Sequence, residues 1–164
     1  MRNNDFVVFI LTHGRSDRVF TYNTIRRSGY SGRIVIVIDN EDKTADRYKK
    51  IYGDEVYTFD KKAVSETFDE GDNFKDRRSI VYARNAVFGI AKELGIRYFM
   101  QLDDDYTGLC FRINDKGQYP SGRFAVKSRL DPILDILIDY YKAINKTGDV
   151  KSIAIAQGLS LIHI

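Results

Sequence analysis

Several residue types are scarce in this chain of 164 residues, and each scarcity excludes a class of protein. A single cysteine, Cys110, excludes an intrachain disulfide and a cysteine-rich zinc site. Only two histidines, His13 and His163, argue against a metal site built from histidines. With two prolines and no Ser/Pro/Gln tract, the chain is not a low-complexity linker. No apolar run approaches the roughly 20 residues of a membrane-spanning helix, so we expect no membrane segment.

The composition that remains is that of a folded globular protein. Hydrophobic residues make up 43% of the chain and charged residues 30%, which suffices for one core and is too apolar for a disordered chain. The length matches about one domain, at roughly 100–200 residues per domain. Residues 1–5 lack the layout of a signal peptide, and one cysteine suits a reducing compartment, so we expect a cytoplasmic protein.

Positive charge is concentrated in one segment. The net charge is +3, but residues 106–130 carry five basic side chains against the single acid Asp115. That segment therefore has a charge of +4, which leaves −1 for the rest of the chain. An ordinary solvated hairpin and a docking surface for a polyanion explain this pattern equally well. On the second interpretation, the side chains that contact nucleic acid are Arg112, Arg123, Lys127 and Arg129.

Strand and helix patterns alternate along the sequence, which predicts an α/β fold. Apolar runs rich in β-branched residues predict strands at 6–11, 33–38, 56–59 and 97–102. Helices are predicted at 16–27, 44–52, 78–94 and 131–145. In the last helix, Asp131 is the expected N-cap and Pro132 the first helical residue. Strands separated by helices imply a mostly parallel sheet with helices on both faces.

Three segments fall outside this alternation. The charged residues 60–78 predict a long mobile loop over the sheet, of a length that is usually functional or disordered. Residues 109–113 and 124–126 predict a hairpin. A last strand is expected at residues 152–156, with no closing helix after it. We therefore expect a sequence truncated at its C-terminal end, whose last few residues need not be native.

Polar residues follow all four predicted strands at the point where each strand ends. They are Thr12–Arg15, Asp39–Asn40, Asp60–Lys62 and Asp103–Asp105. In open α/β sheets, ligands bind at the carboxyl ends of the strands. We therefore expect these four sets to form one site, with Asp39 accepting a hydrogen bond from a ribose or a base edge or else serving as a plain turn residue.

The run Asp103-Asp104-Asp105 is the sharpest of these signals. In extended backbone, residues i and i+2 project to the same side, so Asp103 and Asp105 can converge on one cation while Asp104 faces away. One or two carboxylates open to water and phosphate suit Mn²⁺ or Mg²⁺, which would bridge a diphosphate. An acidic turn that merely ends a strand is the alternative. The position directly after a buried strand favours the functional interpretation.

Other nucleotide-binding patterns are absent. Neither G-x-x-x-x-G-K-[ST] nor G-x-G-x-x-G occurs, and one glycine in the first loop is a poor match to a nucleotidyltransferase. Arg84 borders the apolar face of its predicted helix, where it either lies along the surface or pairs with Asp103, Asp105 or a phosphate. His13 is expected to tune its loop more than to catalyse, and Cys110 to be an inert core residue.

Together these motifs resemble the GT-A glycosyltransferases. The shared elements are a first strand that enters Thr-His-Gly-Arg, an acid after the second strand, Ala-Arg-Asn on a helix and a strand that ends in D-x-D. More narrowly, the segments FILTHGRSDRV, VIDNEDKT, YARN and QLDDDY resemble the TET-associated glycosyltransferase group of phages, which is related to enzymes of DNA base hypermodification. The resemblance covers residues 6–113, and more weakly extends to 158.

The resemblance implies roles for individual residues. Thr12, His13 and Arg15 would form the nucleotide loop, and Asp39 would contact the base or ribose. The nucleotide-sugar-binding residues are then Thr12, His13, Arg15, Asp39, Arg84 and Asp104, with Asp103 and Asp105 as ligands of Mn²⁺ or Mg²⁺. Enzymes of this kind that invert configuration usually place their base after the D-x-D, and we assign no catalytic residue in this chain.

The expected function is a metal-dependent glycosyltransferase with a single GT-A-like domain over residues 1–164. Residues 1–105 would be its donor-binding half and residues 106–164 the start of its acceptor half. The donor is expected to be a nucleotide-sugar, first of all a UDP-sugar, and the acceptor a hydroxyl such as that of a hydroxymethylated base in DNA. A phage-encoded enzyme would act in the host cytoplasm. Two alternatives remain open: a metal-dependent sugar-phosphate nucleotidyltransferase and a catalytically silent nucleic-acid-binding module.

Overall fold

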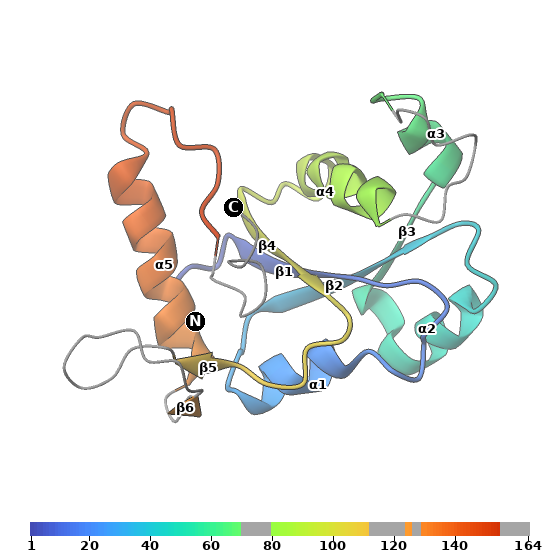
Figure 1. Cartoon of the computed structure of the whole chain (residues 1–164), viewed down its shortest axis with the longest axis horizontal. Helices are drawn as coiled ribbons and strands as arrows, with labels where there is room; N and C mark the ends of the chain where they lie inside the picture. The colour runs from blue at the N-terminus through green and yellow to red at the C-terminus, as the bar shows by residue number, and fades with distance from the viewer. Residues whose placement is uncertain (70–79, 112–123, 126–128, 155–164) are drawn as a thin grey trace, which may run out of the picture.

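The fold is built on one parallel sheet. The computed structural model describes residues 1–69, 80–111, 124–125 and 129–154. The sheet has the order β3-β2-β1-β4 and consists of β1 (Phe6–Leu11), β2 (Arg33–Asp39), β3 (Val56–Phe59) and β4 (Tyr98–Asp103) (Figure 1). The chain moves from β1 to β2 and β3 on one side, and then crosses to place β4 on the other side of β1. The carboxyl ends of β1 and β4 therefore form the switch point at which open α/β sheets bind ligands.

Both faces of the sheet are covered, which explains the continuous apolar run of β1. Phe6, Val8 and Ile10 belong to one core cluster, whereas Val7, Phe9 and Leu11 belong to the other. No residue of β1 is more than 5% exposed. Because alternate residues point to opposite faces, a strand with helices on both sides needs apolar residues at every position.

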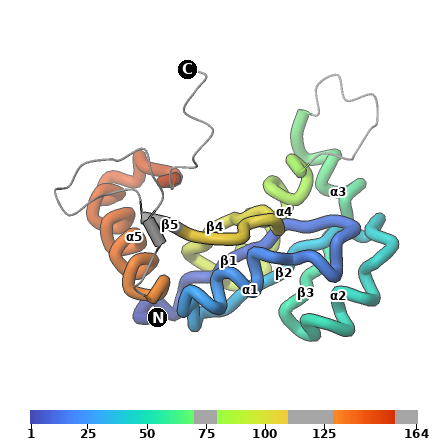
Figure 2. The backbone as a smooth tube through the Cα atoms, turned by 60° about the horizontal axis from the view of Figure 1, so that its bottom comes forward, coloured from blue at the N-terminus to red at the C-terminus, as the bar shows by residue number. Residues whose placement is uncertain are grey.

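Helices cover the two faces unequally. The first cluster includes residues of α1 (Phe20–Arg27), α2 (Ala45–Tyr52) and α5 (Leu130–Ile144). The second cluster lies under α4 (Val81–Glu93), with Val64 of α3 (Lys61–Ser65) packed at its margin. A short 3-10 turn, η1 (Gly53–Glu55), separates α2 from β3. Figure 2 shows these layers along the sheet. The predicted α/β architecture, with helices on both faces of a parallel sheet, is confirmed.

Two of the helix starts that differ from the prediction have a clear physical cause. The helix expected from Ser16 begins at Phe20, because residues 12–19 form a loop in which Arg18 N–H donates to Arg15 C=O at 2.8 Å. The helix expected from Asp131 begins at Leu130, with the extended residue Arg129 as its N-cap. Asp131 is not a cap. Its carboxylate instead accepts hydrogen bonds from the N-terminal ammonium group and from Ser31.

The segments outside the main sheet are partly described. Residues 60–78 are not wholly a loop, because Lys61–Ser65 form α3, and the Asp60 carboxylate caps this helix by accepting from Ala63 N–H at 2.9 Å; residues 70–78 lie outside the described residues. The predicted hairpin is confirmed as an antiparallel pair of β5 (Cys110–Phe111) and β6 (Phe124–Ala125). Of the strand expected at 152–156, residues 152–154 are not in a strand, and the other two lie outside the described residues.

Candidate functional site

A cleft of about 370 Å³ opens at the carboxyl ends of the strands. This volume is within the range of roughly 300–1,000 Å³ that is usual for small-molecule sites. Seven of the eight residues predicted to bind the donor or the metal line it: Thr12, His13, Arg15, Asp39, Asp103, Asp104 and Asp105. Ile80, Tyr82 and Ala83 of the α4 region and Lys61 of α3 complete its wall, together with Leu11 and Phe59. The predicted convergence of polar strand ends is thus confirmed.

The acidic run forms a turn that α1 holds in place. β4 ends at Asp103, and residues 104–105 are in a turn. Thr21, which is fully buried, donates its hydroxyl to Asp103 C=O at 2.6 Å and its N–H to Asp104 C=O at 3.1 Å. Tyr106 N–H donates to the same hydroxyl at 2.9 Å. Thr21 therefore fixes the path of the chain through the aspartates with two hydrogen bonds that it donates and one that it accepts.

The three aspartates have different surroundings. Asp104 is buried and does not face away from the cleft as the strand alternation predicted, because extended backbone ends one residue earlier. Its carboxylate accepts from the Thr12 hydroxyl at 2.6 Å and from the Arg15 guanidinium at 3.1 Å. Asp105 is exposed. The middle carboxylate is therefore engaged by the protein, while the last one faces solvent at the cleft.

Of the two alternatives for Arg84, the structure shows pairing with the acidic run. Its guanidinium lies 3.1 and 3.2 Å from the two carboxylate oxygens of Asp103. The side chains are 54% and 37% exposed, so this pair contributes only about 0–1 kcal/mol to stability. Both groups are thus accessible to a ligand at the cleft.

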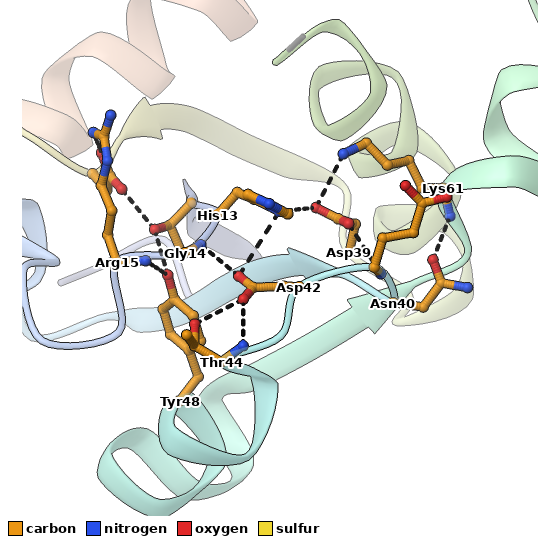
Figure 3. A network of polar contacts seen from close by, with 12 residues as sticks. His13, Gly14, Arg15, Asp39, Asn40, Asp42, Thr44, Tyr48 and Lys61 are labelled. Atoms are coloured by element: carbon orange, nitrogen blue, oxygen red, sulfur yellow. Dashed lines mark hydrogen bonds and ion pairs between the residues drawn. The ribbon is translucent and has the colours of Figure 1, made fainter. Parts of the chain in front are cut away.

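A second charged cluster lies across the cleft from the acidic turn, and Figure 3 shows Asp39 between His13 and Lys61. One Asp39 oxygen lies 2.7 Å from His13 Nδ1 and 3.5 Å from Lys61 Nζ, while the other accepts from Glu41 N–H. The side chains of Asp39 and Lys61 are 5% and 7% exposed, whereas that of His13 is 55% exposed. Asp39 is therefore a buried anchor, and the imidazole is the part of this cluster that solvent reaches.

Asp42 holds the backbone of the first loop. Its carboxylate accepts from Gly14 N–H at 2.7 Å and from the N–H and hydroxyl of Thr44, each at 2.7 Å. Gly14 has a φ of 67°, in the left-handed region that favours glycine. Burial by itself would raise the pKa of Asp42, but these hydrogen bonds, aided by His13, lower it below its ordinary value. The loop that carries His13 and Arg15 is thus fastened to the segment after β2.

Sequence reasoning missed several residues that shape the site. The Asp-x-Thr spacing of Asp42 and Thr44 is a signal for a side-chain–backbone turn and could have been found. Thr21 and Tyr48 carry no such signal, because a threonine and a tyrosine on short helices resemble ordinary packing residues. Lys61 was placed at a strand end, but nothing in the sequence predicts that it is buried against Asp39.

Of the four residues predicted to contact nucleic acid, the structure describes only Arg129, which is not among the residues that line the cleft. Arg112, Arg123 and Lys127 lie outside the described residues. Arg129 lies beside Gly29, and the next N–H, that of Leu130, donates to Ser28 C=O at 2.7 Å. Ser28 and Gly29 follow the C-terminal end of α1, whose last residue, Arg27, lies about 9 Å along the helix from Thr21 at 1.5 Å per residue. The nucleic-acid-binding role of these residues stays a prediction.

The donor set at the cleft fits a hard divalent cation. Among the described residues, no three histidine, cysteine, aspartate or glutamate side chains are grouped as a metal cage. Mg²⁺ does not require such a cage, because it is usually held by one or two carboxylates, with waters and substrate phosphates completing its shell. Asp103 and Asp105 line the cleft together and are accessible. Two such carboxylates beside an open cleft are compatible with this kind of site.

Comparison with known protein families decides the identity. A family model described as TET-Associated Glycosyltransferase matches residues 6–160. The chain belongs to this family. Neither the search of curated proteins nor the search of solved structures found a match. Within the described ranges, the chain has no helix that is long and apolar enough to cross a membrane.

We expect this glycosyltransferase to lose stability below about pH 4. The pKa values of Asp42, Asp131 and Asp135 are lowered: burial opposes the shift, and hydrogen bonds and nearby positive charge outweigh it. Since the unfolded chain then binds more protons than the native state, these groups stabilise the fold above their unfolded pKa of about 3.9. That stability is lost as the pH falls through the lower folded values.

Urea unfolding between pH 7 and pH 2.5 measures this effect. The free energy of unfolding should be nearly constant above about pH 5 and fall steadily below pH 4. Asp42→Asn should lower stability at pH 7 and make the decline at acidic pH shallower. A parent stability that does not change between pH 5 and pH 2.5 would refute the assignment.

Proposed function

We propose that this glycosyltransferase binds a nucleotide-sugar, first of all a UDP-sugar, in the cleft with Mn²⁺ or Mg²⁺ and transfers the sugar to a hydroxyl. The observation that supports this most is the meeting of the acidic turn, the first loop and Asp39 at the switch point of the sheet. We assign residues 1–105 to donor binding and residues 106–164 to acceptor binding.

The charges at the cleft suit a diphosphate and its metal ion. Asp103 and Asp105 would hold the cation, which when bound neutralises the diphosphate and favours departure of the nucleoside diphosphate. Arg15 and Arg84 are each held by one aspartate through part of the guanidinium and are more than half exposed. Because a guanidinium has five N–H donors, each retains donors for phosphate oxygens.

The nucleoside would contact the other side of the cleft. Both Asp39 oxygens already accept hydrogen bonds or pair with Lys61, and the carboxylate is almost fully buried. The exposed group of this cluster is the His13 imidazole. We therefore propose that His13 contacts the base or ribose and that Asp39 holds the imidazole in position.

A thermal-shift screen of UDP-, GDP- and dTDP-sugars, with and without Mn²⁺, tests donor binding. Ligand at about 100 times its Kd stabilises the native state by about 2.7 kcal/mol, so the matching donor should raise Tm with Mn²⁺ and much less without it. A nucleotidyltransferase would instead use a nucleoside triphosphate with a sugar phosphate and release pyrophosphate. A silent nucleic-acid-binding module would bind DNA equally well without metal or nucleotide.

For the acceptor, we propose a hydroxymethylated base in DNA. The family is described as TET-associated, its phage group resembles enzymes of DNA base hypermodification, and residues 106–130 carry a charge of +4. If several of these side chains neutralise phosphates, affinity for duplex DNA should fall with salt with a slope of about −0.9 per phosphate on a log–log plot.

Alanine at Arg123, Lys127 and Arg129 should therefore flatten the salt slope by about two to three units, as measured by fluorescence anisotropy. Nucleotide binding should be unchanged in this variant, because the proposed donor half precedes the segment. A flat salt dependence of the parent protein would instead favour a small or neutral acceptor.

A further inference from the structure

We propose that Tyr48 is a positioning residue of the donor site, although it is not part of the cleft wall. Its hydroxyl links the first loop, which carries His13 and Arg15, to the acidic turn. This inference rests on the proposed function for its consequence in ligand binding. The link itself follows from the hydrogen bonds alone.

The hydrogen bonds form a closed ring. Arg15 N–H lies 2.8 Å from the Tyr48 hydroxyl oxygen, as Figure 3 shows, and that oxygen lies 2.9 Å from the Thr12 hydroxyl. The Thr12 hydroxyl lies 2.6 Å from the Asp104 carboxylate, whose other oxygen accepts from the Arg15 guanidinium at 3.1 Å. The hydrogen bonds thus run from the main-chain N–H of Arg15 through the side chains of Tyr48, Thr12 and Asp104. They close at the guanidinium of the same arginine.

Only one arrangement of protons satisfies this ring. An ionised aspartate is an acceptor only, so Thr12 donates to Asp104 and its oxygen must accept from Tyr48. The Tyr48 oxygen then accepts from Arg15 N–H. Burial raises the pKa of Tyr48, which keeps its hydroxyl protonated and able to donate. Every hydrogen bond of the ring therefore has a fixed donor and a fixed acceptor, and the Asp104 carboxylate is the final acceptor.

The role of Tyr48 is to orient the Thr12 side chain by donating a hydrogen bond to it. Tyr48 is fully buried, and its ring packs in the core cluster on the α2 side of the sheet. α2 is itself fastened by Asp42 and Thr44, so the hydroxyl is a rigid point from which the Thr12 side chain is oriented. Without that hydroxyl, Thr12 loses its donor and Arg15 N–H loses its acceptor. Asp104 then loses its fixed alignment between the first loop and the turn.

The Tyr48→Phe variant tests the inference, with Tyr52→Phe as the matched control. Tyr52 is on the same helix and packs against Tyr48, but its hydroxyl makes no hydrogen bond within the described part of the chain. Each variant removes one oxygen atom and keeps the ring. The first readout needs no ligand: amide exchange by NMR at Thr21 and Tyr106, whose N–H groups hold the acidic turn and do not contact Tyr48.

Tyr48→Phe should speed exchange at both amides about tenfold, whereas Tyr52→Phe should leave it unchanged. The second readout is calorimetric titration with UDP, GDP and dTDP in the presence of Mn²⁺. The nucleotide that binds the parent should bind Tyr48→Phe roughly tenfold more weakly and Tyr52→Phe as tightly as the parent. Unchanged exchange at both amides in Tyr48→Phe would overturn the proposal, as would unchanged nucleotide affinity.

The two readouts separate this inference from the proposed function. If Tyr48→Phe alone speeds exchange at the turn but no nucleotide binds the parent, the ring positions the turn and the proposed donor is wrong. If the parent binds a nucleotide but both phenylalanine variants behave alike, the donor site stands and the role of Tyr48 is refuted.

Discussion

Replacing Asp105 by asparagine is expected to abolish Mn²⁺-dependent binding of a nucleoside diphosphate without weakening the fold. Asp105 is exposed at the cleft, and within the described residues its side chain makes no hydrogen bond or ion pair. If Asp103 and Asp105 hold the cation as proposed, loss of one of these carboxylates should reduce affinity in the presence of Mn²⁺ by more than about 100-fold. A surface substitution of this kind should change the free energy of unfolding by no more than about 0.5 kcal/mol.

Calorimetric titration measures the expected loss of nucleotide affinity, and urea unfolding measures the unchanged free energy of unfolding. Asp54→Asn is a matched control, because Asp54 is also exposed but lies in η1, outside the cleft. It should affect neither binding nor stability. If Asp105→Asn binds Mn²⁺ and nucleoside diphosphate as tightly as the parent, the metal assignment is wrong.

A large loss of stability is expected when Asp39 is replaced by alanine. Lys61 is 7% exposed and is paired with Asp39, so the substitution leaves a buried ammonium group without its carboxylate. Breaking a buried ion pair from one side typically costs about 3–5 kcal/mol, because the remaining charge stays desolvated. The His13 imidazole also loses the carboxylate at 2.7 Å, so nucleotide affinity should fall as well.

The double variant Asp39→Ala/Lys61→Met tests this cause. Methionine keeps much of the lysine's length without its charge, so the double variant should regain most of the stability lost in Asp39→Ala, as seen by urea unfolding. Nucleotide binding should remain weak in the double variant, because His13 still lacks its anchor. If the double variant loses as much free energy of unfolding as the two single variants together, the loss does not come from an unpaired, buried Lys61 ammonium group.

The sheet and the location of the site could be predicted from the sequence because each rests on a short-range pattern. Strands β1 and β2 are apolar at successive positions, and a strand has this pattern when both faces of its sheet are covered. The polar sets that follow the strands meet at one edge because parallel strands share a carboxyl end. The resemblance to the family rests on the same strand ends, and the family match confirms it.

The finer geometry of the site was not predictable in this way. The alternation argument for the three aspartates requires extended backbone, and Thr21 from α1 turns the chain after Asp103. Likewise, Asp131 and Pro132 have the composition of a helix start, but the Asp131 carboxylate pairs with the N-terminal ammonium group and does not cap the helix. In both cases a contact between residues far apart in the sequence prevails over a local preference.

The central claim is transfer of a sugar from a nucleotide to a hydroxyl, and mass spectrometry of both products tests it most directly. The full chain is incubated with Mn²⁺, UDP-, GDP- or dTDP-sugars and duplex DNA that contains hydroxymethylated bases. We predict that one donor yields free nucleoside diphosphate and an equal amount of DNA whose hydroxymethylated base is heavier by one sugar residue, and that Asp105→Asn yields neither. Unmodified DNA with all three donor classes, with each donor recovered intact, would contradict the account.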